Sequence, residues 1–210
     1  MKKLIFVSTG RCGTKRIAQI LEKHLSEEFA VVHQMPFSRV ANVIGNLLFY
    51  LGPSDKIKRF LYNLIVSSYL RKKHFICSDP LTAMLIPKDY INSADVCLVH
   101  IERNPQDFAN SFFKLSRKRI SSFIAHNFIP FWQIGLWPLE NILNPRIKGK
   151  YIKIAKLKNN YFAETFSSNP NYKKIEMDQV FSSNFLNKII HEHFHYKTAI
   201  PDHELQIKAN

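Results

Sequence analysis

The chain has 210 residues, of which 46% are hydrophobic, a composition that suits a folded domain with a substantial core and excludes an intrinsically disordered protein. Thirty Lys and Arg against sixteen Asp and Glu give a formal net charge of +14, which favours an anionic partner: a nucleotide, a nucleic acid, a polyanionic sugar or an acidic membrane surface. Cys12, Cys77 and Cys97 are odd in number, widely spaced and without a CxxC pair, so that neither a disulfide framework nor a cysteine zinc site is indicated.

The apolar stretches of the sequence are short. Residues 3–7 form a run of about five apolar residues, fewer than a signal peptide requires, and the stretches at 40–51, 60–70 and 123–137 are short or interrupted by polar residues and proline. A helix that spans a membrane needs about 18 apolar residues. We therefore expect a soluble, cytoplasmic protein with no transmembrane segment, for which peripheral contact with a membrane stays open.

The order of the expected elements indicates an α/β fold. Residues 3–7 predict a strand buried on both faces, and apolar residues from Ile17 to Leu25 recur at helical spacing after a glycine-bearing turn. The alternation that follows favours a single domain over residues 1–210, with a central parallel sheet flanked by helices. Further strands are expected at 29–32, 74–77, 96–101 and 173–177, and further helices at 38–51, 55–73, 107–119, 151–167 and 184–195, with another between the strands at 74–77 and 96–101.

The loop between the first strand and the first helix predicts a phosphate site. Gly10 and Gly13 allow a tight turn and a close approach of the backbone to a ligand, and cations and hydroxyls surround them. The loop is not a Walker A motif, because only two residues separate the glycines and no hydroxyl follows Lys15 directly. The residues of the loop are Ser8, Thr9, Gly10, Arg11, Cys12, Gly13, Thr14, Lys15 and Arg16.

A second motif follows the strand at 96–101. Arg103 lies at the expected carboxyl end of this strand, and Ser111 lies eight positions later in the helix that follows an Asn-Pro turn. Ligands of open α/β sheets bind at the carboxyl ends of the strands, so that Arg103 and Ser111 can meet at one anion.

These two motifs, about ninety residues apart, resemble those of sulfotransferases that use 3′-phosphoadenosine 5′-phosphosulfate. The resemblance implies the P-loop-like α/β fold that sulfotransferases share with P-loop kinases, and transfer of a sulfuryl group to a hydroxyl or amine acceptor, with a carbohydrate or a lipid as possible acceptors. It assigns Arg11 to the catalytic cation at the bridging oxygen, the loop residues to the 5′-phosphosulfate, and Arg103 and Ser111 to the 3′-phosphate. The implied donor-binding residues are Arg11, Cys12, Gly13, Thr14, Lys15, Arg16, Arg103 and Ser111.

Sulfuryl transfer also needs a group that accepts the proton of the acceptor, and it needs no metal. Asp79 is the first candidate, because it follows the strand at 74–77, where the resemblance places a base; the alternative is an Asp-Pro start of a helix. His33, which follows the second strand, is the runner-up, because its ordinary pKa of about 6.5 suits a base near neutrality.

Two other functions stay open. A P-loop-like nucleotide kinase would bind ATP with Mg²⁺, but the loop lacks the Lys-Ser/Thr pair. A basic module without catalytic activity would bind nucleic acid or an acidic membrane, with steep salt dependence and no nucleotide specificity; nucleic acid is the less favoured partner.

Overall fold

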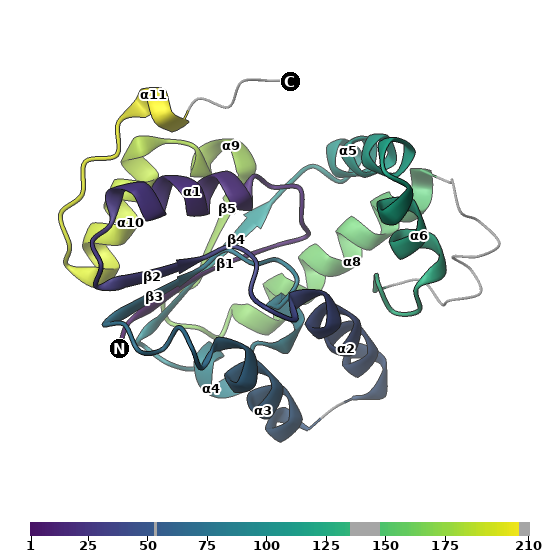
Figure 1. The fold of residues 1–210 in the computed structure, drawn as a ribbon, viewed down its shortest axis with the longest axis horizontal. Helices are drawn as coiled ribbons and strands as arrows, with labels where there is room; N and C mark the ends of the chain where they lie inside the picture. Colours follow the sequence, from purple (N-terminus) through teal and green to yellow (C-terminus); the bar gives the residue numbers. More distant parts are fainter. Residues whose placement is uncertain (53, 135–147, 206–210) are drawn as a thin grey trace.

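The computed structural model describes residues 1–52, 54–134 and 148–205, and within them five parallel strands form one sheet in the order β2-β3-β1-β4-β5 (Figure 1). The fold is therefore α/β with a single parallel sheet flanked by helices, as expected. The strands are β1 (Lys3–Ser8), β2 (Phe29–Val32), β3 (His74–Cys77), β4 (Val96–Glu102) and β5 (Lys173–Glu176).

Strand β1 lies at the centre of the sheet and pairs with β3 on one side and β4 on the other; Lys3 lies opposite both Phe75 and Val96. A strand in this position is buried on both faces, which explains why its sequence is a continuous apolar run without alternation. Successive side chains point to opposite faces, so that Leu4 and Phe6 enter one hydrophobic core and Ile5 and Val7 enter another.

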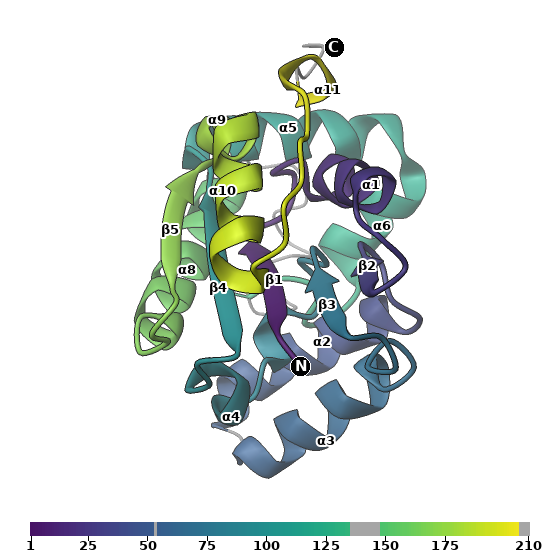
Figure 2. The same ribbon diagram turned by 90° about the vertical axis from the view of Figure 1, so that its left-hand side faces the viewer.

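The helices cover both faces of the sheet (Figure 2). One layer packs on the face of Leu4 and Phe6 and the other on the face of Ile5 and Val7. The first layer contains α1 (Thr14–His24), α9 (Met177–Val180), α10 (Ser183–Phe194) and α11 (Asp202–Leu205), and the second contains α2 (Ser38–Leu51), α3 (Asp55–Val66), the 3₁₀ turn η1 (Ala83–Leu85), α4 (Lys88–Ile91) and α8 (Lys148–Phe166).

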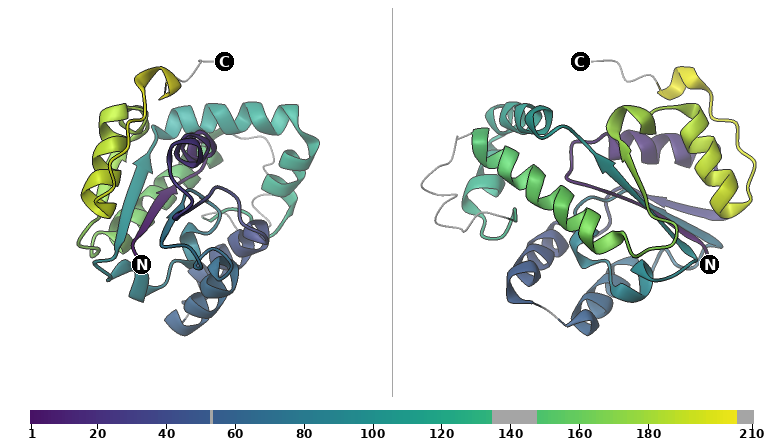
Figure 3. Two further views of the ribbon diagram at one scale, coloured as in Figure 1. Left: turned by 60° about the vertical axis from the view of Figure 1, so that its left-hand side comes forward. Right: turned by 180° about the vertical axis from the view of Figure 1, so that it is seen from behind.

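Two further helices, α5 (Pro105–Lys118) and α6 (Ile120–Phe128), follow β4. Seen from behind, α8 crosses the sheet and reaches α5 (Figure 3). A third core cluster joins α5 to α8, in which Phe108 and Phe112 from α5 pack with Tyr151 and Ile154 from α8. Helices α5 and α6 lie beyond the carboxyl edge of the sheet (Figure 1).

All five strands lie where the sequence places them, and the helix boundaries differ in a few places. The expected helix at 55–73 ends at Val66, so the prediction is wrong for 67–73. The Ser67 hydroxyl donates to the Leu64 carbonyl, 3.2 Å away, a local bond that competes with helix continuation. The helix expected between β3 and β4 consists of the short η1 and α4, and α6 was not predicted. Among the described residues, no helix is both long and apolar enough to cross a bilayer.

Candidate functional site

Four parallel strands end at one edge of the sheet, and each continues into a segment that the sequence singles out. The loop predicted to bind phosphate, residues 8–16 (the phosphate loop), follows β1, and His33 follows β2. Asp79 lies two residues after β3, and Arg103 follows β4. After β1 the chain turns towards β2, and after β4 it turns towards β5, on the opposite side of the sheet. Such a switch point opens a crevice at the carboxyl ends of the two strands, the common ligand position in open α/β sheets.

The phosphate loop has a tightly turned backbone. Gly10, Arg11 and Gly13 have φ angles of 94°, 58° and 70°, in the left-handed region that favours glycine. Gly13 also precedes the first turn of α1, and a Cβ atom added to it would lie 2.3 Å from Cζ of Phe181. Glycine is therefore required at position 13 both by the backbone angle and by the packing of the Phe181 ring.

This turn places the start of α1 at the sheet edge. The amides of Arg16 and Ile17 donate to the Gly13 carbonyl at 2.8 and 3.1 Å, and these bonds begin the helix. The amides of Thr14 and Lys15 precede them and have no acceptor within the helix. Unpaired amides and the positive end of the helix dipole favour an anion at this position.

The two sequence motifs meet in space. Nε of Arg11 donates a hydrogen bond to Oγ of Ser111 at 3.0 Å, and Nη1 of Arg103 donates to the carbonyl oxygen of Arg11. The pKa of Arg11 is lowered, mainly by partial burial and then by the positive charges of Arg103 and Arg119. An anion bound here would relieve this repulsion and could bind guanidinium groups from the segments that follow β1 and β4.

A cavity of about 620 Å³ opens beside the loop. This volume lies in the range of small-ligand sites. Five cationic side chains line it, and no Asp or Glu does so among the described residues. The cations come from the loop, α2, the α5–α6 junction and α8: Arg11, Lys15, Arg39, Arg119 and Lys158. Like charges gathered in a partly enclosed space attract a polyanion.

His33 lines this cavity. Its Nδ1 lies 3.2 Å from the carbonyl oxygen of Ser78. Because a carbonyl only accepts, Nδ1 carries the proton in the neutral ring, and Nε2 keeps a lone pair. Burial lowers the pKa of His33 below its ordinary value. The side chain is therefore neutral near pH 7 and has a basic nitrogen to offer.

Asp79 does not line the cavity and is only 1% exposed. Its Oδ2 accepts bonds from the Met35 amide, at 3.1 Å, and from the Ser38 hydroxyl, while its Oδ1 accepts from the Leu81 amide at 3.0 Å. Burial raises the pKa of this carboxyl, and the bonds to Ser38, Leu81 and Met35 oppose the rise. Asp79 thus ties the end of β3 to the start of α2.

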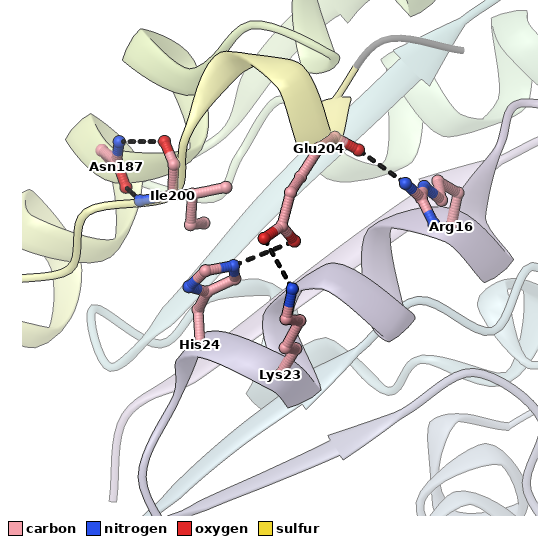
Figure 4. Close-up of polar contacts among 6 residues, drawn as sticks. All are labelled: Arg16, Lys23, His24, Asn187, Ile200 and Glu204. Carbon is pink, nitrogen blue, oxygen red and sulfur yellow. Dashed lines mark hydrogen bonds and ion pairs between the residues drawn. The ribbon is translucent and has the colours of Figure 1, made fainter. Parts of the chain in front are cut away.

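Two of the loop residues assigned to donor binding, Cys12 and Arg16, do not line the cavity. Nη2 of Arg16 donates to the backbone carbonyl of Glu204 in α11 at 2.7 Å (Figure 4), and Arg16 is not among the lining residues. Cys12 is fully buried, and its Sγ donates to the Gly10 carbonyl at 3.2 Å; burial raises the pKa of its thiol. Of the other predicted donor-binding residues, Arg11, Gly13, Thr14 and Lys15 line the cavity, whereas Arg103 and Ser111 lie outside its lining and contact Arg11.

Several cavity residues were missed by sequence reasoning, above all Lys158, His126 and Gln133. Lys158 is one of several lysines in α8, a pattern that suggests a solvated face. A signal was present, however, because Lys158 lies at helical spacing from Tyr151 and Phe162, on the apolar face of the helix.

No family model, curated protein or solved structure matches this chain. Among the described residues, no cluster of three or more His, Cys, Asp or Glu side chains could hold a metal ion.

Proposed function

We propose that this chain is a sulfotransferase that binds 3′-phosphoadenosine 5′-phosphosulfate and transfers its sulfuryl group to a hydroxyl or amine acceptor. The observation that carries the proposal is the contact between the two motifs. Arg11 from the loop after β1 and Ser111 from the helix after β4 are 100 residues apart in sequence and 3.0 Å apart in space. Arg103 reaches the same loop through the Arg11 carbonyl. A donor with phosphates at both its 5′ and 3′ positions suits two adjacent groups of anion-binding residues.

In the proposed donor complex, the phosphosulfate lies at the start of α1. The amides of Thr14 and Lys15, the Lys15 ammonium and the Arg11 guanidinium face the charge that develops on the leaving phosphate. Arg11 acts by its fixed charge, because an arginine of high pKa is a poor proton donor. Arg103 and Ser111 hold the 3′-phosphate; the guanidinium has five N–H donors, and the bond to the Arg11 carbonyl uses one of them.

The proposed reaction breaks the bond between sulfur and the bridging phosphate oxygen and forms a bond between sulfur and the acceptor oxygen or nitrogen. The acceptor loses one proton in this step. We assign this proton to Nε2 of His33, since His33 lines the cavity and its Nδ1 is turned to the Ser78 carbonyl. Asp79, the first candidate by sequence, has both carboxylate oxygens engaged by other groups and serves the proposal as a structural anchor.

The architecture supports the proposal in general terms. A parallel sheet with a glycine-bearing loop between its central strand and the following helix suits phosphate binding. Because its two motifs resemble those of sulfotransferases, we assign this architecture to the fold that sulfotransferases share with P-loop kinases. The loop itself, with Arg16 after Lys15 in place of a hydroxyl, favours the former over the latter.

Thermal unfolding with two ligands tests the proposal. A ligand whose free concentration is about a hundred times its dissociation constant adds roughly 2.7 kcal/mol to the free energy of unfolding. We expect 3′-phosphoadenosine 5′-phosphate to raise the melting temperature, and ATP with Mg²⁺ to do so much less. A shift with ATP and Mg²⁺ alone would favour a kinase, and no shift with either would favour a basic binding module; both results would overturn the proposal.

A further inference from the structure

Lys158 differs from the other cations of the cavity. Lys15, Arg39 and Arg119 are exposed to solvent, whereas Lys158 is only 4% exposed although it lines the cavity. It has no hydrogen bond and no ion pair with any described residue. The apolar face of α8 carries it inwards, because Tyr151 and Phe162 on the same face are fully buried.

A buried ammonium group without a partner is unfavourable. Lysines are almost never fully buried unless they are paired, since the loss of hydration has to be compensated by an opposite charge or by hydrogen bonds. Burial accordingly lowers the pKa of Lys158 to about 8, so that at neutral pH it is still mostly protonated. The described part of the chain provides no counter-charge in the cavity, which makes an external anion the natural partner.

Two further polar side chains of the cavity are buried, His126 and Gln133. Nε2 of Gln133 lies 2.9 Å from Nδ1 of His126, and Oε1 of Gln133 is buried without a hydrogen-bond partner. The pKa of His126 is lowered to about 3, by burial first and then by the charges of Lys158 and Lys150. His126 is therefore neutral, and with Nδ1 accepting from Gln133, its Nε2 carries a proton that it can donate.

These groups lie beside the donor loop and not within it. The ring of Phe112 stands between them: a Cβ atom on Gly10 would lie 4.0 Å from Phe112 Cε2, and the rings of Phe112 and His126 have centroids 4.7 Å apart. One aromatic ring thus separates the loop from His126. A group bound near His126 and Lys158 would belong to a molecule that lies next to the donor.

We propose that Lys158, His126 and Gln133 form a subsite for a negatively charged group of the acceptor, so that the acceptor class is a hydroxylated acid such as a sugar that carries a carboxylate, a sulfate or a phosphate. The identification of the bound molecule as the acceptor rests on the proposed function. The ammonium group and the His126 N–H bind the acidic group, and Gln133 orients the His126 ring through its bond to Nδ1.

Calorimetric titration of the protein saturated with 3′-phosphoadenosine 5′-phosphate tests the subsite, with glucuronate as the probe and glucose as its neutral counterpart. We expect glucuronate to bind at least about tenfold more tightly than glucose, a difference of about 1.4 kcal/mol. Glucose 6-sulfate and glucose 6-phosphate distinguish which acidic group fits. The variant Lys158→Met should bind glucuronate no better than glucose, and Lys158→Arg should keep part of the preference.

Lys156→Met is the matched control, because Lys156 is an exposed lysine of the same helix and its loss changes the net charge equally. Equal binding of glucuronate and glucose by the wild-type protein would overturn the subsite, as would an equal loss in both Met variants. Failure of 3′-phosphoadenosine 5′-phosphate to bind would instead overturn the proposed function. The same titrations without that nucleotide would then still decide whether Lys158 holds an acidic group.

Discussion

Nε of Arg11 lies 3.0 Å from Oγ of Ser111, a contact that joins the loop after the central strand to the helix after its neighbour. The side chain of Arg11 thus contacts Ser111, while its backbone carbonyl accepts a hydrogen bond from Arg103. Under the proposed function, this contact belongs to the site of the 3′-phosphate, whose recognition can therefore be tested directly.

Replacing Arg103 should selectively weaken the binding of a nucleotide that carries a 3′-phosphate. Hydrogen bonds to charged groups contribute about 1.5–3 kcal/mol, so Arg103→Ala should lower affinity for 3′-phosphoadenosine 5′-phosphate by roughly 10- to 100-fold. Affinity for AMP, which lacks the 3′-phosphate, should change little. Calorimetric titration of both nucleotides measures this, and equal losses for the two would remove Arg103 from the 3′-phosphate site.

Arg16→Ala serves as the control for that experiment. Its guanidinium donates to the Glu204 carbonyl in α11, whereas that of Arg103 donates to the Arg11 carbonyl in the loop, so the removal of Arg16 should leave the affinity for both nucleotides unchanged. A loss of affinity in Arg16→Ala comparable with that of Arg103→Ala would return Arg16 to the donor-binding residues.

His33 and Asp79 should respond differently to substitution. We expect His33→Gln to slow sulfuryl transfer by about 10²- to 10⁴-fold, because it removes the proposed base, while donor binding is retained. Asp79→Asn should lower the free energy of unfolding, because the carboxylate bonds to Met35, Ser38 and Leu81 are weakened. Rates with glucuronate as acceptor and urea unfolding curves test the pair. Full activity in His33→Gln together with inactive but stable Asp79→Asn would reverse the assignment.

Lys158→Met should stabilise the protein. The pKa of Lys158 is lowered by burial from 10.5 to about 8, and one pKa unit corresponds to about 1.4 kcal/mol, so the buried charge costs on the order of 3 kcal/mol at pH 7. Between pH 8 and 10.5 the unfolded chain still holds the proton that the folded chain has released, so wild-type stability rises with pH across this window.

Urea unfolding at pH 7 and pH 10.5 measures this difference. The variant should be more stable than the wild type at pH 7, and the gap should narrow at pH 10.5. A constant gap at both pH values would mean that packing, and not the buried charge, separates the two proteins.

Glu204 holds α11 against α1. Its Oε1 and Oε2 accept from Lys23 and His24 at 2.7 and 3.0 Å, which lowers the pKa of Glu204 to about 2, and Asn187 bonds Ile200 in the preceding segment (Figure 4). Because the folded pKa is depressed, the stabilisation is complete above the ordinary pKa of 4.5 and is lost as the pH falls towards 2.

Glu204→Gln should therefore speed hydrogen exchange of the α11 amides at pH 7, and the difference from wild type should shrink below pH 3. Affinity for 3′-phosphoadenosine 5′-phosphate should not change, since the Glu204 carboxylate contacts Lys23 and His24 and none of the residues assigned to the nucleotide. Unaltered exchange in α11 at pH 7 would show that the ion pairs do not hold this helix.

The strands and the phosphate loop could be predicted from the sequence because their signals are local. A buried parallel strand is a continuous apolar run, and Gly10 and Gly13 beside Arg11 and Lys15 indicate an anion site without reference to the rest of the chain. The end of α3 was harder to place, because residues 67–73 contain no glycine or proline and keep a helix-compatible composition.

The direction of individual side chains could not be predicted. Arg16 follows Lys15 directly, but successive residues of a helix point about 100° apart, and Arg16 meets α11 while Lys15 lines the cavity. The surroundings of Lys158 were equally hidden, because His126 and Gln133 come from a segment more than twenty residues earlier whose position depends on tertiary packing.

Gly13 and Phe181 limit the mutations that this fold can accept. The ring of Phe181 occupies the space where a side chain at position 13 would begin, and the φ angle of 70° at Gly13 disfavours such a side chain in any case. A larger residue at position 13 would first require a smaller one at position 181, and would remain strained even then. Among related chains, we therefore expect glycine at position 13 wherever an aromatic ring occupies position 181.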